Sequence, residues 1–286
     1  MLASIKEVCA LFKKYWDLHS KALSAIHNKV GPSFRTIFIL NTLVVALLSN
    51  NTAVAEILFQ SDFKDKSLQG IYPELPNQTN NTFVPWSDRY VFRLQVYATD
   101  PLVNGKKRAE LTWPALASNG AYTYRFSEFL PSDYVPDRSA ESIAQWHDTP
   151  DTYLGESYRI PALAILTQNG HIKLNGRWDP NALTVDNTPG PGGGVYSADL
   201  GPYTTGQWNN FAVYVHWSYG KDGFLAIYNN GVEIFRRTGP NYYNDKVGPY
   251  MKLGIYKWDW TDQPGYSEVQ RRTMFLDNVR VNTGLQ

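Results

Sequence analysis

Short stretches of alternating apolar and polar residues recur along the chain after residue 56. This period of two is typical of β-strands that bury one face, because successive side chains point to opposite sides of a strand. No long segment after residue 56 keeps a helical period, and turn-forming residues separate the stretches. The clearest predicted strands are Tyr90–Tyr97, Tyr122–Phe129, Ile143–His147, Ala162–Thr167, His171–Asn175, Phe211–Ser218, Phe224–Tyr228, Val232–Arg236, Met251–Tyr256 and Thr273–Val281. The pattern therefore predicts an all-β fold.

The spacing of these strands also predicts their arrangement. Asn229-Asn230-Gly231 separates two of the strands, and Asn-Gly favours a tight hairpin because both residues accept positive φ. Many short strands without helices predict a sandwich or jelly roll of two packed antiparallel sheets. Residues 185–206 are rich in Gly and Pro, so we expect a loop there that rims a binding groove.

The N-terminal region differs from the rest of the chain. Thr36 to Leu48 is an apolar run of 13 residues, shorter than the about 20 that a membrane-spanning helix needs. Arg35 precedes this run, and Ala53-Val54-Ala55 matches a signal-peptidase site. We expect residues 1–55 to be a leader and signal peptide, and residues 56–286 a single domain that is secreted or periplasmic. The alternative is an uncleaved signal anchor.

Cleavage after Ala55 changes the charge and the thiol content. It removes six basic and two acidic residues from totals of 27 and 26, which leaves a formal net charge of −3. It also removes Cys9, the one cysteine, so cysteine catalysis and zinc–thiolate sites are excluded from the exported domain. The acidic balance disfavours nucleic acid as a partner. We expect a monomer without stable membrane association.

Aromatic residues are frequent, with 9 Trp and 19 Tyr among 286 residues. They suit either a β-sheet core or platforms on which sugars stack. A hydrophobic content of 43% is enough for a substantial core.

Two strand segments carry polar side chains that share a face. Gln145 and His147 lie on one side of their strand, with Trp146 on the other. Arg108 likewise shares a side with Glu110 in the segment Arg108–Leu111.

A third segment, Tyr250–Tyr256, places Lys252, Gly254 and Tyr256 on one face. If the three faces meet, a cation, an imidazole and a phenol converge on one groove. Such a set can hold a carboxylate and move a proton beside it.

The three segments, RAEL, QWH and YMKLGIY, resemble the motifs R-x-E-L, Q-x-H and Y-x-K-x-G-x-Y of alginate-lyase-type polysaccharide lyases. The longer run Ile143–Asp151 is more similar to heparin lyase I and glucuronan lyase. The resemblance spans most of residues 56–286 and keeps the order of the motifs. It implies a concanavalin-like β-jelly roll and cleavage of a uronic-acid polysaccharide by β-elimination.

The resemblance implies a catalytic set that agrees with the chemistry of its side chains. Arg108 and Gln145 suit neutralisation of the uronate carboxylate. His147 suits the base that removes the C5 proton, and Tyr256 suits the acid that protonates the leaving oxygen, or both roles. Tyr256 as a base would need a neighbouring cation, for which Lys252 and Arg108 are candidates.

Each of these residues also has a purely structural interpretation. His147 would be a hydrogen-bonded strand histidine and Tyr256 part of the core. Arg108 and Glu110 would form an ion pair, and Lys252 would be a solvated edge residue.

Further residues are candidates for substrate binding. From the motifs these are Lys252, Glu110 and Tyr250, and from strand alternation His216, which shares a face with Tyr214. Trp258 and Trp260 follow Tyr256 on one face and would be either a sugar platform or core.

No cofactor is required for the chemistry. Asp277 lies where related jelly rolls bind a structural calcium, so a calcium ion there is possible.

The sequence favours an acidic polysaccharide without sulfate, such as glucuronan or alginate, over a heparin-like polymer. A net charge of −3 gives no sign of the basic cleft that sulfates need. Trp258 stands where family 7 alginate lyases usually carry Gln. The competing functions are a non-catalytic, laminin-G-like carbohydrate-binding module and, last, a glycoside hydrolase, whose paired carboxylates are not apparent.

Overall fold

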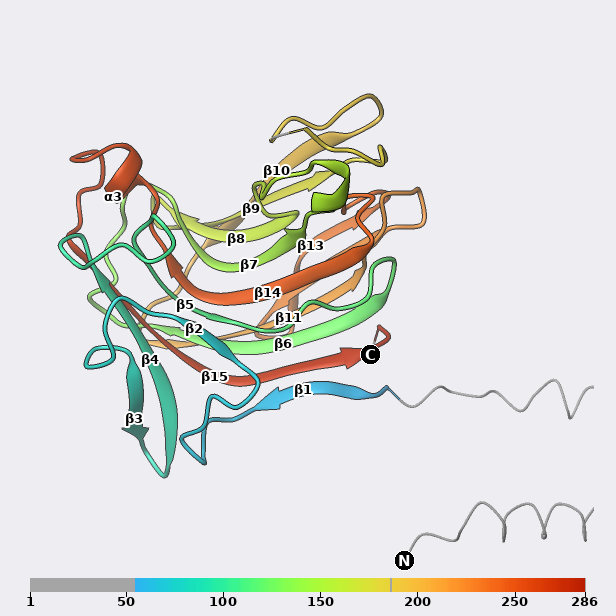
Figure 1. The fold of residues 1–286 in the computed structure, drawn as a ribbon. Coiled ribbons are helices and arrows are strands. Elements are labelled where there is room, and N and C mark those ends of the chain that lie inside the picture. Colours follow the sequence, from blue (N-terminus) through green and yellow to red (C-terminus); the bar gives the residue numbers. More distant parts are fainter. Residues whose placement is uncertain (1–54, 186, 286) are drawn as a thin grey trace, which may run out of the picture. The chain divides into compact units, whose positions relative to one another are not determined.

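The computed structural model describes residues 55–185 and 187–285 (Figure 1). Nearly all of the expected leader and signal peptide lies outside the described residues, so it stays a prediction. Within the described residues, no helix is both long and apolar enough to span a membrane.

The described chain folds into two antiparallel sheets packed face to face (Figure 1). The first, here called the back sheet, has the order β13-β12-β11-β6-β15-β4-β3, with β1 paired to β15. Its strands are β1 (Ile57–Ser61), β3 (Thr82–Trp86), β4 (Arg89–Tyr97), β6 (Ala121–Leu130), β11 (Gln207–His216), β12 (Phe224–Asn229), β13 (Val232–Thr238) and β15 (Arg271–Thr283).

The second sheet, here called the cleft sheet, has the order β10-β9-β8-β7-β14-β5-β2. Its strands are β2 (Tyr72–Glu74), β5 (Arg108–Thr112), β7 (Glu141–Thr149), β8 (Leu163–Gln168), β9 (His171–Trp178), β10 (Gly194–Pro202) and β14 (Val247–Tyr256). Two single-turn helices, η1 (Thr152–Leu154) and α3 (Asp259–Asp262), lie in the connections. Figure 1 shows β7, β8 and β14 curved, with their concave side turned away from the back sheet.

The predicted jelly roll of two antiparallel sheets is confirmed, and every strand predicted from the alternation is present. The expected loop over residues 185–206 is partly wrong, because Gly194–Pro202 forms the edge strand β10, paired with β9. Its Gly and Pro content is typical of a loop, but an edge strand tolerates both residues.

Turn chemistry placed the β12–β13 hairpin correctly. Asn230 and Gly231 have φ of 49° and 80°, the left-handed values that a tight hairpin turn requires.

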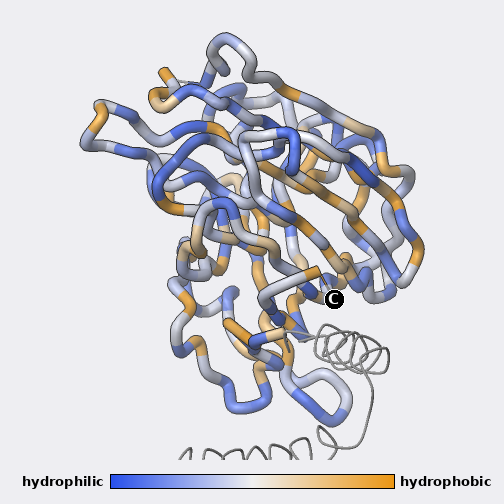
Figure 2. The backbone as a smooth tube through the Cα atoms, turned by 90° about the vertical axis from the view of Figure 1, so that its right-hand side faces the viewer, coloured by the Kyte–Doolittle hydropathy of each residue, from blue (hydrophilic) through white to orange (hydrophobic). Residues whose placement is uncertain are grey.

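The core fills the space between the sheets, and hydropathy alternates along the strands (Figure 2). Trp146, on the cleft sheet, is 0% exposed and meets Tyr124 of the back sheet edge-on, with ring centroids 5.4 Å apart. The predicted orientation of Trp146 toward the core is confirmed.

One polar side chain interrupts this core. Glu128 lies in β6 between Phe126 and Leu130 on the core-facing side and is 0% exposed. Neither of its carboxyl oxygens has a hydrogen-bond partner among the described residues. Burial therefore raises the pKa of Glu128 well above its usual value, which favours the neutral carboxyl group in the folded protein.

This buried carboxyl predicts a pH-dependent loss of stability. Above a pH near 4.5 the unfolded chain releases the Glu128 proton while the folded protein keeps it, so the free energy of unfolding falls as pH rises toward the folded pKa. In Glu128→Gln this contribution is absent. Chemical denaturation at pH 5 and pH 8 should show the free energy of unfolding of the variant rising relative to that of the wild type. An unchanged difference would contradict the prediction, and Asp88→Asn, at an exposed site, is the control.

Candidate functional site

A cavity of about 660 Å³ lies over the concave face of the cleft sheet. This cavity, here called the cleft, is lined by Lys106, Arg108, Ser142, Gln145, His147, Tyr158, Arg159, Ile160, Pro161, Ala164, Leu166, Asn175, Arg177, Asn187, Tyr256, Trp258 and Asp262. All four residues predicted to be catalytic are among them. The cleft therefore brings together predicted catalytic residues that are up to 148 positions apart in the sequence, Arg108 and Tyr256.

The pairing of β14 with β5 and β7 explains this convergence. Tyr256 lies opposite Arg108 on β5, and Lys252 lies opposite Gln145 on β7. Tyr250 lies opposite His147. Because these residues alternate with core residues, all of them point away from the back sheet.

The glycine at position 254 has a structural reason. Its φ is 137°, and a Cβ atom there would stand 2.3 Å from the main-chain oxygen of Ala109. Glycine is thus required by the close contact between β14 and β5.

Arg108 is the centre of a buried charge network. Its Nη1 lies 3.1 Å from Glu74 Oε2 and 3.3 Å from Glu110 Oε2, and its guanidinium lies 4.4 Å from the ring centroid of Tyr256. The ion pair with Glu110 that the sequence offered as an alternative is present. It holds the guanidinium at the Tyr256 ring.

Glu74 is the anion that balances the two cations of this network. It accepts Lys252 Nζ at 2.6 Å as well as Arg108. Although burial alone would raise the pKa of Glu74, Lys252 and Arg108 together lower it, and the carboxylate stays charged. Sequence reasoning missed Glu74, because β2 has only three residues and shows no period.

Glu110 lies deeper than Glu74. It is 1% exposed, and Gln145 Nε2 donates to its Oε1 at 2.5 Å. Burial raises the pKa of Glu110, against the effect of Lys252 and Arg108. Glu110 contacts both Arg108 and Gln145, and it is not among the residues that line the cleft.

His147 is fixed on two sides. Its ring stacks on that of Tyr250, with centroids 5.3 Å apart, and its Nδ1 lies 3.1 Å from Asp148 Oδ1. The other carboxylate oxygen of Asp148 lies 2.8 Å from Arg159. The Nδ1 side of the imidazole thus faces Asp148, an arrangement that orients a histidine.

Arg159 is surrounded by three carboxylates, those of Asp148, Glu156 and Asp245. Burial and the two neighbouring carboxylates raise the pKa of Asp245 to about 8, despite the opposing effect of Arg159.

Burial also raises the pKa of Tyr256, although Arg108 acts in the opposite direction. The cation next to Tyr256 is Arg108, since Lys252 is bound to Glu74. The phenol is therefore protonated at neutral pH in the unliganded cleft.

Comparisons with known proteins agree with this geometry. The family model described as polysaccharide lyase matches residues 66–280. The protein belongs to the polysaccharide lyase family. It is an enzyme that breaks carbon–oxygen bonds in polysaccharides, and this decides against a non-catalytic module.

Solved structures with the same fold include two lyases. The endo-β-1,4-glucuronan lyase of the fungus Trichoderma reesei has a TM-score of 0.67 and 18% identity, over 80% of this chain and 96% of that chain. A family 14 alginate lyase from Aplysia kurodai has a TM-score of 0.53 and 10% identity, over 80% of this chain and 100% of that chain. At these identities the likeness concerns the fold. No curated protein matches the chain.

Among the other predicted residues of the lyase, Trp258 lines the cleft, and its ring lies 5.5 Å from that of Tyr256. The expected common strand face for Trp258 and Trp260 is wrong, because β14 ends at Tyr256 and α3 follows. Trp260 packs against the core, and its Nε1 donates to the main-chain oxygen of Val269 at 3.1 Å.

His216 is also misplaced by the sequence prediction. It ends β11 in the back sheet, and its Nδ1 lies 2.9 Å from the main-chain oxygen of Asp222. Alternation gave its neighbours on the strand correctly but carries no information on which sheet the strand joins.

Lys252 and Tyr250 are not among the residues that line the cleft. Lys252 is 5% exposed, and the partly exposed Tyr250 stacks on His147. Their direct contact with substrate stays a prediction.

Asp277, at which a calcium ion stays a prediction, is held by groups of the protein. Its Oδ2 accepts from Arg89 Nε at 2.8 Å, and its Oδ1 accepts the main-chain N–H of Asn278 at 2.8 Å. A guanidinium thus already balances this carboxylate. Among residues 55–185 and 187–285, no group of three or more His, Cys, Asp or Glu side chains is arranged to hold a metal.

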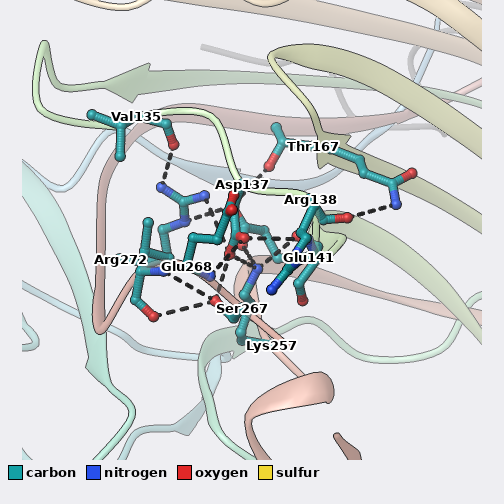
Figure 3. Close-up of polar contacts among 12 residues, drawn as sticks. Val135, Asp137, Arg138, Glu141, Thr167, Lys257, Ser267, Glu268 and Arg272 are labelled. Atoms are coloured by element: carbon teal, nitrogen blue, oxygen red, sulfur yellow. Dashed lines mark hydrogen bonds and ion pairs between the residues drawn. The ribbon is translucent and has the colours of Figure 1, made fainter. Parts of the chain in front are cut away.

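A second buried charge network fixes the backbone next to Tyr256 (Figure 3). Lys257 Nζ lies 2.7 Å from Asp137 Oδ2 and 2.5 Å from Glu141 Oε2, and Arg272 Nε lies 2.7 Å from Glu141 Oε1. The Lys257 and Glu141 side chains are 0% exposed. Since Lys257 stands between Tyr256 and Trp258, the network anchors the segment that carries two cleft residues.

Replacement of Lys257 by Met should strongly destabilise the lyase. It leaves two acids without their shared cation in the interior, and breaking a buried pair in this way costs about 3–5 kcal/mol in the free energy of unfolding. Chemical denaturation measures the loss. Arg271→Gln, which breaks the exposed pair with Asp133, is the control and should cost less than about 1 kcal/mol. Equal losses in the two variants would contradict the account.

Proposed function

We propose that the lyase is secreted and cleaves an acidic polysaccharide that contains uronic acids, by β-elimination. The observation that carries this proposal is the meeting of Arg108, Gln145, His147 and Tyr256 at one cleft. A cation, an amide donor, an imidazole and a phenol are the groups that this reaction requires at a uronate.

The reaction depends on neutralising a carboxylate. Removal of the C5 proton places negative charge on the adjacent carboxylate, which must be stabilised as it develops. Arg108 supplies a fixed positive charge held by Glu74 and Glu110. Gln145 uses one amide N–H for Glu110, and its second N–H remains for the substrate carboxylate.

Proton transfer completes the elimination. His147 takes the C5 proton, the C4–O bond breaks as the C4=C5 double bond forms, and Tyr256 gives its proton to the departing oxygen. Asp148 orients the imidazole through Nδ1, which leaves Nε2 as the basic atom. Burial keeps Tyr256 protonated, which suits the acid.

His147 and Tyr256 lie at different points of the cleft. Tyr256 is six positions along β14 from Tyr250, the partner of His147, which corresponds to about 20 Å of extended strand. Both side chains nevertheless line the same cavity, and the proposed elimination requires that the curvature of β7 and β14 bring them to adjacent atoms of one sugar, His147 to the C5 proton and Tyr256 to the C4 oxygen.

An unsulfated uronan is the favoured substrate. Three of the four cations that line the cleft, Lys106, Arg108 and Arg159, are paired with acids, so little free positive charge is available for sulfate groups. The similarly folded Trichoderma reesei enzyme is a glucuronan lyase and the Aplysia kurodai enzyme an alginate lyase, in keeping with this class.

The test is incubation of the purified protein with glucuronan, alginate, heparin and hyaluronan. Elimination creates a C4=C5 double bond next to the carboxylate, which absorbs in the ultraviolet. Absorbance should rise with glucuronan or alginate and remain flat with heparin. Folded protein that gives no rise on any of the four polymers would refute the proposal.

Tyr256→Phe tests the site itself. The change removes one hydroxyl, and loss of a general acid lowers the rate by about 10²–10⁴-fold. We expect kcat to fall accordingly while the thermal unfolding midpoint changes little. Tyr214→Phe, on the back sheet, is a matched control that should keep full activity. Retained activity in Tyr256→Phe would exclude Tyr256 as the acid.

A further inference from the structure

Four cationic side chains line the cleft, and three of them have acidic partners. Lys106 pairs with Asp262. Arg108 pairs with Glu74 and Glu110. Arg159 pairs with Asp148, Glu156 and Asp245. The fourth cation is Arg177 on β9.

Arg177 has no ion pair with an acidic residue of the described chain, residues 55–185 and 187–285. Its Nη1 donates to the main-chain oxygen of Asn187 at 3.3 Å, and its Nε is buried without a hydrogen-bond partner. What distinguishes Arg177 from the other three cations of the cleft is therefore that no acid of the described residues balances its charge. Because its guanidinium lines the cleft, an anion that enters the cleft can bind to it.

The strand register gives the position of Arg177 relative to the proposed base. Trp146 lies opposite Leu163 on β8, and Leu163 lies opposite Gly176 on β9. The next row of the sheet therefore contains His147, Ala162 and Arg177, and the N–H of Arg177 donates to the Ala162 oxygen at 2.8 Å. Two strand spacings, about 10 Å, separate the backbones of His147 and Arg177.

Arg108 lies much farther from Arg177. Strands β14, β7 and β8 stand between β5 and β9, which gives four strand spacings, or about 19 Å. Arg108 and Arg177 thus line opposite sides of the cleft. One carboxylate cannot be bound by both.

We propose that Arg177 binds the carboxylate of a sugar next to the cleaved one, and so selects polymers in which neighbouring sugars are also charged. The inference rests on the proposed cleavage of a uronan and adds a second anion site to it. A guanidinium suits this work because two parallel N–H groups match the two oxygens of a carboxylate.

Binding of oligosaccharides tests this site apart from turnover. The Tyr256→Phe protein, with and without Arg177→Gln, is titrated calorimetrically with a tetrasaccharide of 4-linked glucuronic acid and with the matching neutral glucose tetrasaccharide. Loss of one charge-assisted contact should weaken binding of the acidic tetrasaccharide about tenfold. Binding of the neutral tetrasaccharide should not change.

Lys173→Gln is the matched control. Lys173 lies on the same strand and face as Arg177, but its Nζ is paired with Asp199 at 2.8 Å. Its replacement should leave the affinity unchanged. Arg177→Lys keeps the charge without the paired donors and should give an intermediate loss; if Arg177→Gln does not fold, this variant decides.

Three results would overturn the inference. These are unchanged affinity for the acidic tetrasaccharide in the Arg177 variants, an equal loss in Lys173→Gln, and a larger loss for a heparin tetrasaccharide, which would assign the site to sulfate. An Arg177-dependent affinity combined with no elimination on any uronan would instead refute the proposed reaction and keep the anion site.

Discussion

Strand β14 is hydrogen-bonded to β5 on one side and to β7 on the other, and the position of every proposed catalytic group follows from these two pairings. A shift of one residue in either register would turn one set of polar side chains into the core. Gly254 secures the pairing with β5, because any side chain there would collide with the main chain of Ala109. The trio of strands therefore acts as a rigid support for the cleft.

Charge compensation is the second constraint on the cleft. Arg108, Arg159 and Lys257 are each held by two or more acids. Such buried networks contribute little net stability compared with apolar packing, but they penalise alternative arrangements of the same side chains. Here they hold Arg108 against the Tyr256 ring, Asp148 beside His147, and the main chain at Lys257.

The charged groups are consequently distributed unevenly along the cleft. At one side, Arg108 and Tyr256 form a cation–phenol pair. At the other, His147 lies in the same row as Arg177, the cation without an acidic partner in the described chain. A polymer with repeated negative charges matches this distribution better than a single small acid, which agrees with membership of a polysaccharide lyase family.

Alternation along the chain was sufficient to predict most of the strands, their inward and outward faces and the β12–β13 turn, because these depend on near neighbours in the sequence. It also gave Gln145 and His147 a common face opposite Trp146. It did not predict β1, β2, β3 or β10. Which strands pair, and which sheet each joins, depends on contacts between distant residues. For this reason His216 was assigned to the wrong side of the molecule, and Glu74 and Arg177, which belong to no motif, were missed.

The sequence by itself thus determined the fold class and the types of side chain present at the site, since both follow from patterns among residues that are close in the sequence. The tertiary structure alone decided which charges neutralise one another. Asp277 pairs with Arg89, Lys252 pairs with Glu74, and Arg177 pairs with no acid in the described chain. Charge pairing acts over a few ångströms in space, and residues at that distance are far apart in the sequence.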